Sequence, residues 1–322
     1  MSARGGLRLD RPRSLALDRS CNLYVADSLG YRVIKVDRAG AATIVAGGGT
    51  ASPSEATAAV QARLGAPQSL SVDPAGNLYI GTDDARVLKL APDGTMRPIA
   101  GNGSCGSGGP PSGPATQAAV CVPTGLAVDR SGDLYVADGG NRYVSRVSPE
   151  GVVSVVAGVG ERQSSGDEGP ATLARLGDPQ GLAVDAAGVL YLADGFSTTV
   201  RKVAGGRISR FAGGGSSSSL VPQPAVSADI YPQGLALDGG GNLYIADDLH
   251  HQVRKVTPDG VIETVAGRGV PGFSGDQGRA TAASLRFPRG VAFDSDGNLY
   301  IADTGNDHVR RVSRDGVIGT VI

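Results

Sequence analysis

The stretch Pro288-Arg-Gly-Val-Ala-Phe-Asp-Ser-Asp-Gly-Asn-Leu-Tyr-Ile-Ala-Asp303 decides the fold, because close variants of it occur six times in the 322-residue chain. Each copy opens with a Pro-x-[Gly/Ser]-apolar step, and the opening prolines are separated by 55, 56, 56, 53 and 56 residues. They are Pro12, Pro67, Pro123, Pro179, Pro232 and Pro288. A period of this length indicates that one supersecondary unit is repeated along the chain.

Each repeat contains four short segments with the alternation of apolar residues that is typical of strands. Clear examples are residues 181–185, 242–247, 253–256 and 261–265. A four-stranded meander cannot bury both of its faces alone, whereas six of them stacked radially can. The sequence therefore predicts an all-β fold, a six-bladed β-propeller with four-stranded antiparallel blades around a central channel. We expect residues 1–322 to form this single domain.

The composition fits a turn-rich β-protein and argues against two classes of partner. The chain has 50 Gly, 19 Pro, no Trp and 40% hydrophobic residues, with a formal net charge of −1. Such a charge gives no basic field to attract nucleic acid. No stretch reaches the roughly 20 apolar residues of a membrane span, and Met1–Gly6 lacks the apolar core of a signal peptide. We expect a soluble monomer without membrane contact, cytoplasmic as given, and secreted or extracellular if a signal or anchor has been removed.

The chain has three cysteines, too few and too odd in number for a disulfide framework. Cys105 and Cys121 flank one long loop and could close it by a bridge, which would leave Cys21 free. The interpretation that we favour at this point is three unpaired thiols in a reducing compartment, with the loop-closing bridge as the open alternative.

The repeats resemble the NHL repeat family, whose unit reads Pro-x-Gly-apolar-Ala-apolar-Asp, then Gly-Asn-apolar-Tyr-apolar-Ala-Asp, then Gly-Asn and a basic strand. The sixth repeat matches nearly throughout, since Gly305-Asn306 and Arg310-Arg311-Val312 follow the stretch quoted above. The resemblance implies a six-bladed propeller along essentially the whole chain. It implies no single function, because similar propellers serve as RNA-binding modules, protein-interaction modules, extracellular sensor domains and a few enzymes, among them a zinc-dependent peptide-amidating lyase.

A residue type that occurs in nearly every repeat is most simply explained by what every blade needs. The aspartate that closes the second strand is therefore predicted to form hydrogen bonds within the fold. It occurs as Asp27, Asp138, Asp194, Asp247 and Asp303. A basic residue recurs in all six third strands, and we expect it to lie on a solvated or salt-bridged blade surface rather than to contact nucleic acid. These residues are Lys35, Lys89, Arg146, Lys202, Lys255 and Arg311.

Glycine-rich linkers of about 20 residues join successive repeats, and residues 166–176 and 274–285 are the fullest. They lack the Gly-x-x-x-x-Gly-Lys-[Ser/Thr] pattern of a phosphate-binding loop. Each also offers only one or two carboxylates, too few for a calcium site. The linkers are therefore predicted to be packed surface loops that end in a helical turn.

Residues that differ between repeats gather at the channel mouth of blades 5, 6 and 1, beside the opening prolines and between the second and third strands. The ligand-binding candidates are Arg13, Tyr31, Tyr231, Asp248, Phe287 and Arg289, and the catalytic candidates are His250, His251 and His308. Arginine forks suit carboxylate or phosphate, aromatic faces give apolar contact, and histidine exchanges protons near neutral pH. The adjacent His250 and His251 would point apart on an extended segment, so we predict no metal site.

Two functions fit this sector. The first is a binding or interaction module that holds a small anionic molecule or peptide at the channel mouth, and it is favoured because no catalytic motif occurs in the sequence. The second is a stand-alone enzyme, a lyase, hydrolase or cyclase of a small metabolite, with a histidine as acid or base and an arginine as anchor. RNA binding is a distant third, because exposed aromatic platforms are scarce. We predict no cofactor.

Overall fold

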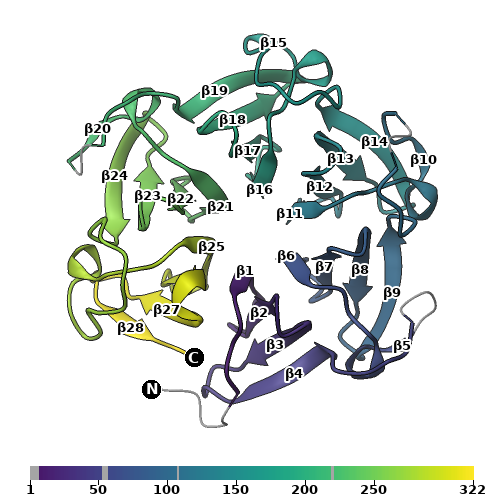
Figure 1. Cartoon of the computed structure of the whole chain (residues 1–322), viewed down its shortest axis with the longest axis horizontal. Coiled ribbons are helices and arrows are strands. Elements are labelled where there is room, and N and C mark those ends of the chain that lie inside the picture. The colour runs from purple at the N-terminus through teal and green to yellow at the C-terminus, as the bar shows by residue number, and fades with distance from the viewer. Residues whose placement is uncertain (1–6, 53–56, 107–108, 219–220) are drawn as a thin grey trace.

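The structure, a computed structural model, describes residues 7–52, 57–106, 109–218 and 221–322. Six antiparallel sheets are arranged in a ring around a central channel, which confirms the predicted six-bladed β-propeller (Figure 1). Blades 1 and 6, the first and last along the chain, lie side by side in the same view. The stretch Met1–Gly6, on which we predicted the absence of a signal peptide, lies outside the described residues.

Each blade consists of four consecutive strands, and each opening proline is the first residue of the innermost one. Blade 1 contains β1 (Pro12–Leu17), β2 (Leu23–Asp27), β3 (Arg32–Val36) and β4 (Ala42–Gly47). Blade 2 contains β6 (Pro67–Val72), β7 (Leu78–Thr82), β8 (Arg86–Leu90) and β9 (Thr95–Ala100). Blade 3 contains β11 (Pro123–Val128), β12 (Leu134–Asp138), β13 (Tyr143–Val147) and β14 (Val152–Ala157).

The second half of the ring has the same order of strands. Blade 4 contains β16 (Pro179–Val184), β17 (Leu190–Asp194), β18 (Thr199–Ala204) and β19 (Arg207–Gly213). Blade 5 contains β21 (Pro232–Leu237), β22 (Leu243–Asp247), β23 (Gln252–Val256) and β24 (Val261–Ala266). Blade 6 contains β25 (Pro288–Phe293), β26 (Leu299–Asp303), β27 (His308–Val312) and β28 (Ile318–Thr320).

The linkers add two kinds of element to this frame. Blades 2 to 5 each gain a two-residue fifth strand on the outer edge, which the prediction of four strands did not include. These are β5 (Thr57–Ala58), β10 (Gly113–Pro114), β15 (Gly169–Pro170) and β20 (Gln223–Pro224). The predicted helical turns are present as the 3-10 helices η1 (Ala59–Gln61), η2 (Ala115–Gln117), η3 (Ala171–Leu173), η4 (Ala225–Ser227) and η5 (Ala280–Ala282), and a sixth, η6 (Thr304–Asn306), follows β26.

The hydrophobic core lies between neighbouring blades rather than inside one sheet. One cluster, for example, joins Ala26 and Val33 of blade 1 to Ala59 of η1 and to Leu78 and Ile80 of blade 2. A corresponding cluster joins each of the other pairs of adjacent blades, including blades 6 and 1. The ring is therefore held together by apolar burial at every junction.

The long loop before blade 3 is closed by a disulfide between Cys105 and Cys121. Our preferred interpretation of three unpaired thiols was wrong for these two residues, because the loop brings their Cα atoms to 4.1 Å. Cys21 has a free thiol. No helix among the described residues is long and apolar enough to cross a membrane.

Reduction of the Cys105–Cys121 bridge is expected to lower the free energy of unfolding by about 2 kcal/mol, the low end of the usual range, because the bridge closes a short loop at the edge of the ring. Urea denaturation with and without dithiothreitol measures this difference. Cys21→Ser serves as the control, since it should leave the effect of the reductant unchanged. Equal stability in both conditions would contradict the prediction.

Candidate functional site

A cavity of about 580 Å³ opens at the channel mouth, lined by residues of blades 5, 6 and 1 and also of blade 2. Its lining includes five of the residues that the sequence singled out, namely Arg13, Tyr31, Asp248, Phe287 and Arg289. The channel behind it is narrow, with a volume of about 70 Å³. A small molecule therefore has room at the mouth of the channel but not inside it.

Two arginines and one aspartate form the inner end of this cavity. Arg13 and Arg289 each follow an opening proline, so each is the second residue of an innermost strand. Nη2 of Arg289 lies 3.4 Å from Oδ2 of Asp248, whose side chain is only 4% exposed. Nη1 of Arg13 donates a hydrogen bond to Oε1 of Gln68. These three residues carry one positive charge more than negative, whereas the whole cavity lining contains four arginines and four aspartates.

Burial and like charge perturb these groups. Burial, reinforced by the nearby charge of Arg289, lowers the pKa of Arg13 to about 10. Burial raises the pKa of Asp248 above its usual range, although the two arginines oppose that shift. Two atoms of the group, Oδ1 of Asp248 and Nε of Arg289, are buried and have no hydrogen-bond partner among the described residues. Unpaired buried polar atoms are rare in proteins, and the Asp248–Arg289 pair has one on each side.

The rim of the cavity is held by backbone in an unusual conformation. Arg11 and Phe287, the residues before the opening prolines of blades 1 and 6, have φ values of 52° and 49°. The corresponding residues of the other four blades do not adopt positive φ. Such strain at non-glycine residues is costly and tends to occur at functional sites. The N–H of Arg11 donates to Oδ1 of Asp307 at 2.9 Å.

His251 supports this rim and does not line the cavity. Its Nδ1 accepts a hydrogen bond of 3.2 Å from the backbone N–H of Phe287, and the two rings meet edge to face at 4.8 Å. The imidazole is thereby committed to orienting Phe287. Its role is structural support of a residue that faces the cavity.

The other predicted residues also lie away from the cavity lining. Nδ1 of His250 is 2.7 Å from Oδ1 of Asp247, and the same carboxylate oxygen accepts the backbone N–H of Tyr231 at 2.8 Å. The ring of His308 stacks at 4.7 Å on Phe273. The sequence placed these residues in the correct blades, but the structure does not bring them together with the two arginines.

The pKa values of the two histidines that follow Asp247 in the chain are expected to shift in opposite directions. The hydrogen bond to Asp247 raises the pKa of His250, whereas burial lowers the pKa of His251. Protonated His250 therefore stabilises the fold fully below its unfolded pKa of about 6.5, and this contribution is lost as pH rises through the raised value. His251 has the opposite effect, since its protonation destabilises the fold as pH falls.

Nitrogen-15 NMR of histidine-labelled protein measures both values, with His250→Gln to assign the resonances. Titration of His251 at a higher pH than His250 would refute this expectation.

Sequence reasoning missed three arginines whose side chains are at most 1% exposed: Arg201, Arg254 and Arg310. They occupy the same position in the third strands of blades 4, 5 and 6, where the other blades have Ile34, Leu88 and Ser145. The linker aspartates Asp167 and Asp276 pair with two of them. These aspartates, in the glycine-rich linkers, thus neutralise buried charge within the fold.

The residues that repeat behave as predicted. The aspartates at the end of the second strand accept backbone N–H groups, as in the bond of 2.7 Å from Arg286 to Asp303. The basic residues of the third strands are partly or fully exposed, and Arg146 pairs with Asp133 at 3.3 Å.

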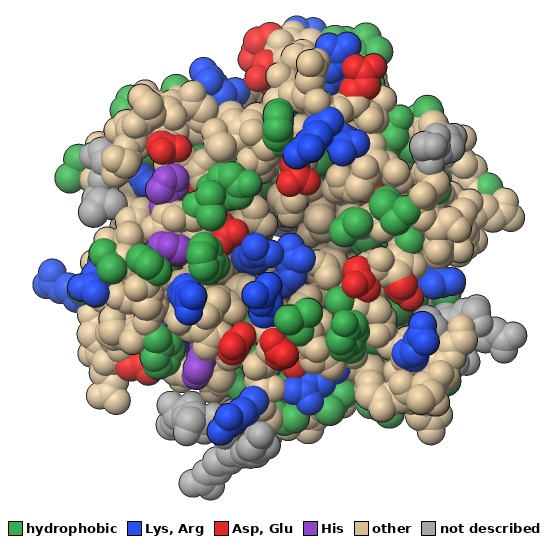
Figure 2. Space-filling model, in the orientation of Figure 1, with side chains coloured by type: hydrophobic (Ala, Val, Ile, Leu, Met, Phe, Trp, Pro, Cys, Tyr) green, Lys and Arg blue, Asp and Glu red, His purple; other side chains and the backbone are tan. Residues whose placement is uncertain are grey.

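Another group of charged side chains lies at the channel mouth. Figure 2 shows Lys and Arg side chains gathered beside the centre of the ring, with Asp and Glu side chains next to them.

Family comparisons agree with this architecture. Residues 120–148 match the family model described as NHL repeat, and residues 271–322 match the model described as Teneurin NHL domain. Teneurin-m of Drosophila melanogaster is 30% identical over 289 residues, which cover 81% of this chain and 10% of that protein. Teneurin-1 of Mus musculus is 30% identical over 239 residues, which cover 66% of this chain and 8% of that protein. The chain thus spans about a tenth of the length of these relatives.

Solved structures share the fold at low sequence identity. A structural genomics protein of unknown function from Bacteroides thetaiotaomicron has a TM-score of 0.70 at 19% identity, covering 95% of this chain and 70% of that one. A streptogramin B lyase has a TM-score of 0.58 at 12% identity, with coverage of 98% and 84%. The gluconolactonase XC5397 of Xanthomonas campestris has a TM-score of 0.59 at 16% identity, with coverage of 91% and 83%. At these identities the likeness concerns the fold alone.

Proposed function

Because the chain belongs to the NHL repeat family and folds as a six-bladed β-propeller, we propose that it is a binding module whose channel-mouth cavity holds the anionic group of a small molecule or peptide. The observation that carries this proposal is the group of Arg13, Arg289 and Asp248 at the inner end of the cavity. Two guanidinium forks face one carboxylate there, and Nε of Arg289 has no partner among the described residues. The side chain of Arg289 is 34% exposed, so its guanidinium can bind a carboxylate or phosphate in the cavity.

The rest of the cavity fits a ligand that also has an apolar part. Its volume of about 580 Å³ lies within the range of small-molecule sites, about 300 to 1,000 Å³. Tyr31 is 52% exposed, and Phe287 also lines the cavity. Aromatic faces at the rim would contact the apolar part of the ligand while the arginines hold its charged end.

Binding without chemistry is favoured over the enzyme alternative by the positions of the histidines. The enzyme alternative uses a histidine as acid or base, and that histidine must lie within hydrogen-bonding reach of the ligand. His250 is engaged with Asp247, His251 with the backbone of Phe287, and His308 with Phe273. None of the three lines the cavity that contains Arg13 and Arg289.

The disulfide supports a proposal about the compartment. Disulfides persist in oxidising surroundings and are rare in the cytosol. The Cys105–Cys121 bridge therefore favours a secreted or extracellular setting over the cytoplasm.

Multivalent anions should raise the melting temperature of the protein if the proposed site binds them. The probes are citrate and pyrophosphate, compared with sodium chloride at equal ionic strength. Arg13→Gln and Arg289→Gln should each weaken binding roughly tenfold, because a hydrogen bond to a charged group contributes about 1.5 kcal/mol or more. Arg146→Gln, on the outer surface of blade 3, is the matched control and should respond like the wild type. An equal response in all four proteins would overturn the proposal.

A further inference from the structure

Five of the six blade junctions are filled by the same structural plug, which we define as the 3-10 helix of each linker, η1 to η5. The first alanine of each plug donates its N–H to the carbonyl oxygen of a glycine in the turn between the third and fourth strands of the following blade. The pairs are Ala59 to Gly94, Ala115 to Gly151, Ala171 to Gly206, Ala225 to Gly260 and Ala280 to Gly316, at 2.8 to 3.0 Å. These alanines are at most 1% exposed.

The plugs share a sequence pattern that explains their fit. A second buried alanine follows three residues after the first, and a buried aliphatic residue follows two residues later. In the plug of η1 these are Ala62 and Leu64, and in that of η3 they are Ala174 and Leu176. Only small side chains fit where a helical turn is inserted between two sheets. The pattern Ala-x-x-Ala-x-aliphatic is therefore the sequence pattern that the five filled junctions share.

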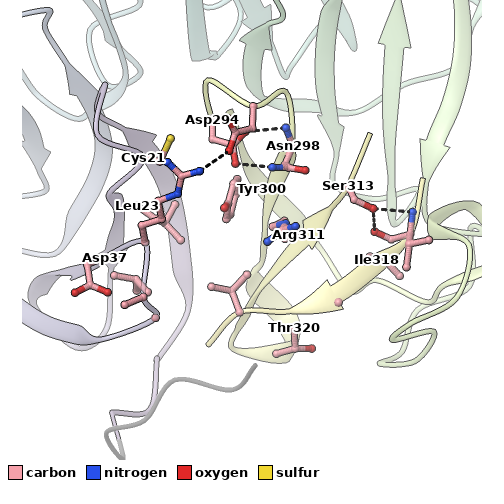
Figure 3. A pocket seen from close by; sticks show the side chains of 18 of the residues that line it. Cys21, Leu23, Asp37, Asp294, Asn298, Tyr300, Arg311, Ser313, Ile318 and Thr320 are labelled. Carbon is pink, nitrogen blue, oxygen red and sulfur yellow. Dashed lines mark hydrogen bonds and ion pairs between the residues drawn. The ribbon is translucent and has the colours of Figure 1, made fainter. Parts of the chain in front are cut away.

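The sixth junction, between blades 6 and 1, contains no such plug among the described residues. It holds instead a groove of about 630 Å³. Figure 3 shows Leu23 and Asp37 of blade 1 on one side of it, and Tyr300, Arg311 and Thr320 of blade 6 on the other. Contacts of Cys21 with Ser295 and of Arg38 with Asp296 connect the two blades at the groove.

Blade 1 keeps the acceptors that a plug would use. Gly40 stands in its turn where the other blades have their plug-binding glycines, and it lines the groove. No backbone N–H of the described residues donates to its carbonyl oxygen. Blade 1 is also a four-stranded sheet, so the outer edge of β4 has no fifth strand from the described residues. Open strand edges pair readily with a further extended segment.

The start of β4, next to the groove, has a smaller residue than the corresponding strands at the filled junctions. Ala42 begins β4, whereas the corresponding residue of every other blade is larger and buried: Met96, Val153, Ile208, Ile262 and Ile318. The sequence before blade 1 keeps only the aliphatic position of the plug pattern, as the buried Leu9. Counting back eight residues from Pro12, as in four of the plugs, gives Arg4 and Leu7 in place of the two alanines.

We infer that this groove is a docking site for a segment of another polypeptide with the chemistry of the plug. The segment has two extended residues that pair with the edge of β4 at Ala42, then a 3-10 turn with alanine at both buried positions. The N–H of its first alanine donates to the carbonyl oxygen of Gly40. Its buried positions are uncharged, because the five filled junctions bury only alanine and an aliphatic side chain there.

A fluorescent peptide with the sequence of residues 166–176, Gly-Asp-Glu-Gly-Pro-Ala-Thr-Leu-Ala-Arg-Leu, tests the inference by anisotropy with the full chain. We expect saturable binding that is abolished when both alanines of the peptide are replaced by arginine. Gly319→Trp should weaken binding at least tenfold, because Gly319 lines the groove and a Cβ added there meets no atom within 4 Å. Gly239→Trp is the matched control, since a side chain there also enters open space, outside the groove.

Absence of saturable binding, or binding that Gly319→Trp leaves unchanged, would overturn the inference. Binding that appears only after removal of residues 1–6 would also overturn it, because the chain's own segment would then cover the groove. Arg13→Gln and Arg289→Gln should bind the peptide like the wild type. The inference about the docking site and the proposal of the anion site can therefore be refuted independently of each other.

Discussion

Asp303→Thr is expected to lower the free energy of unfolding by about 4 kcal/mol, because it removes the counter-charge of a buried guanidinium. The side chains of Arg310 and Asp303 are both 0% exposed, and Nη1 of Arg310 lies 3.5 Å from Oδ2 of Asp303. The second partner of Arg310 is Asp276, at 2.6 Å, whose side chain is 44% exposed. The substitution also removes the acceptor of the Arg286 N–H at 2.7 Å. Urea denaturation measures the loss.

The chain supplies a matched control for this prediction in blade 2. Thr82 and Leu88 occupy there the positions of Asp303 and Arg310, so the same fold tolerates an uncharged pair. The double variant Asp303→Thr with Arg310→Leu should therefore cost only about 1 kcal/mol, since no charge is left unpaired in the interior. A double variant as unstable as the single one would show that the pair contributes through its charge and not only through the penalty of an orphaned partner.

The repeat allowed the fold to be predicted from the sequence, but it did not indicate that three arginines are buried. The aspartates at the end of the second strand recur in five blades, and their role as hydrogen-bond acceptors followed from that recurrence. Arg310 and its two equivalents occur in only three blades, and arginine is normally exposed. Two of the three pair with linker aspartates 34 residues away in sequence, as Arg201 does with Asp167. A position filled by arginine in some blades and by Ile34 or Leu88 in others was the available signal.

The candidate site could be predicted from the sequence only where the repeat determines the place of a side chain. Arg13 and Arg289 directly follow an opening proline, so their place at the channel mouth follows from the strand in which each is the second residue. A loop position, by contrast, specifies the blade but not the direction of a side chain. His251 has a φ of 56°, and its imidazole packs against Phe287. Neither the positive φ nor the partner can be inferred from the residue type.

Gly234→Ala is expected to cost about 3 kcal/mol and to weaken the proposed anion site at the same time. The innermost strands of adjacent blades pack so closely that a Cβ at Gly234 would lie 2.3 Å from the carbonyl oxygen of Arg289 and 3.1 Å from Cα of Gly290. Backbone atoms cannot turn aside as a flexible side chain can, so β25 must shift. Because Arg289 is the second residue of that strand, beside Pro288, its guanidinium would move relative to Asp248.

Gly239→Ala separates this effect from the general effect of replacing glycine. A Cβ at Gly239 meets no atom within 4 Å, so the substitution should be neutral or slightly stabilising through the unfolded state. Urea denaturation gives the two stabilities, and the citrate-induced rise in melting temperature reports on the site. If Gly234→Ala were about as stable as Gly239→Ala, the ring would be able to widen and accept the methyl group. In that case the spacing of β21 and β25 would not be what fixes Arg289 against Asp248, and the arginine would have to be held by its own contacts at the cavity.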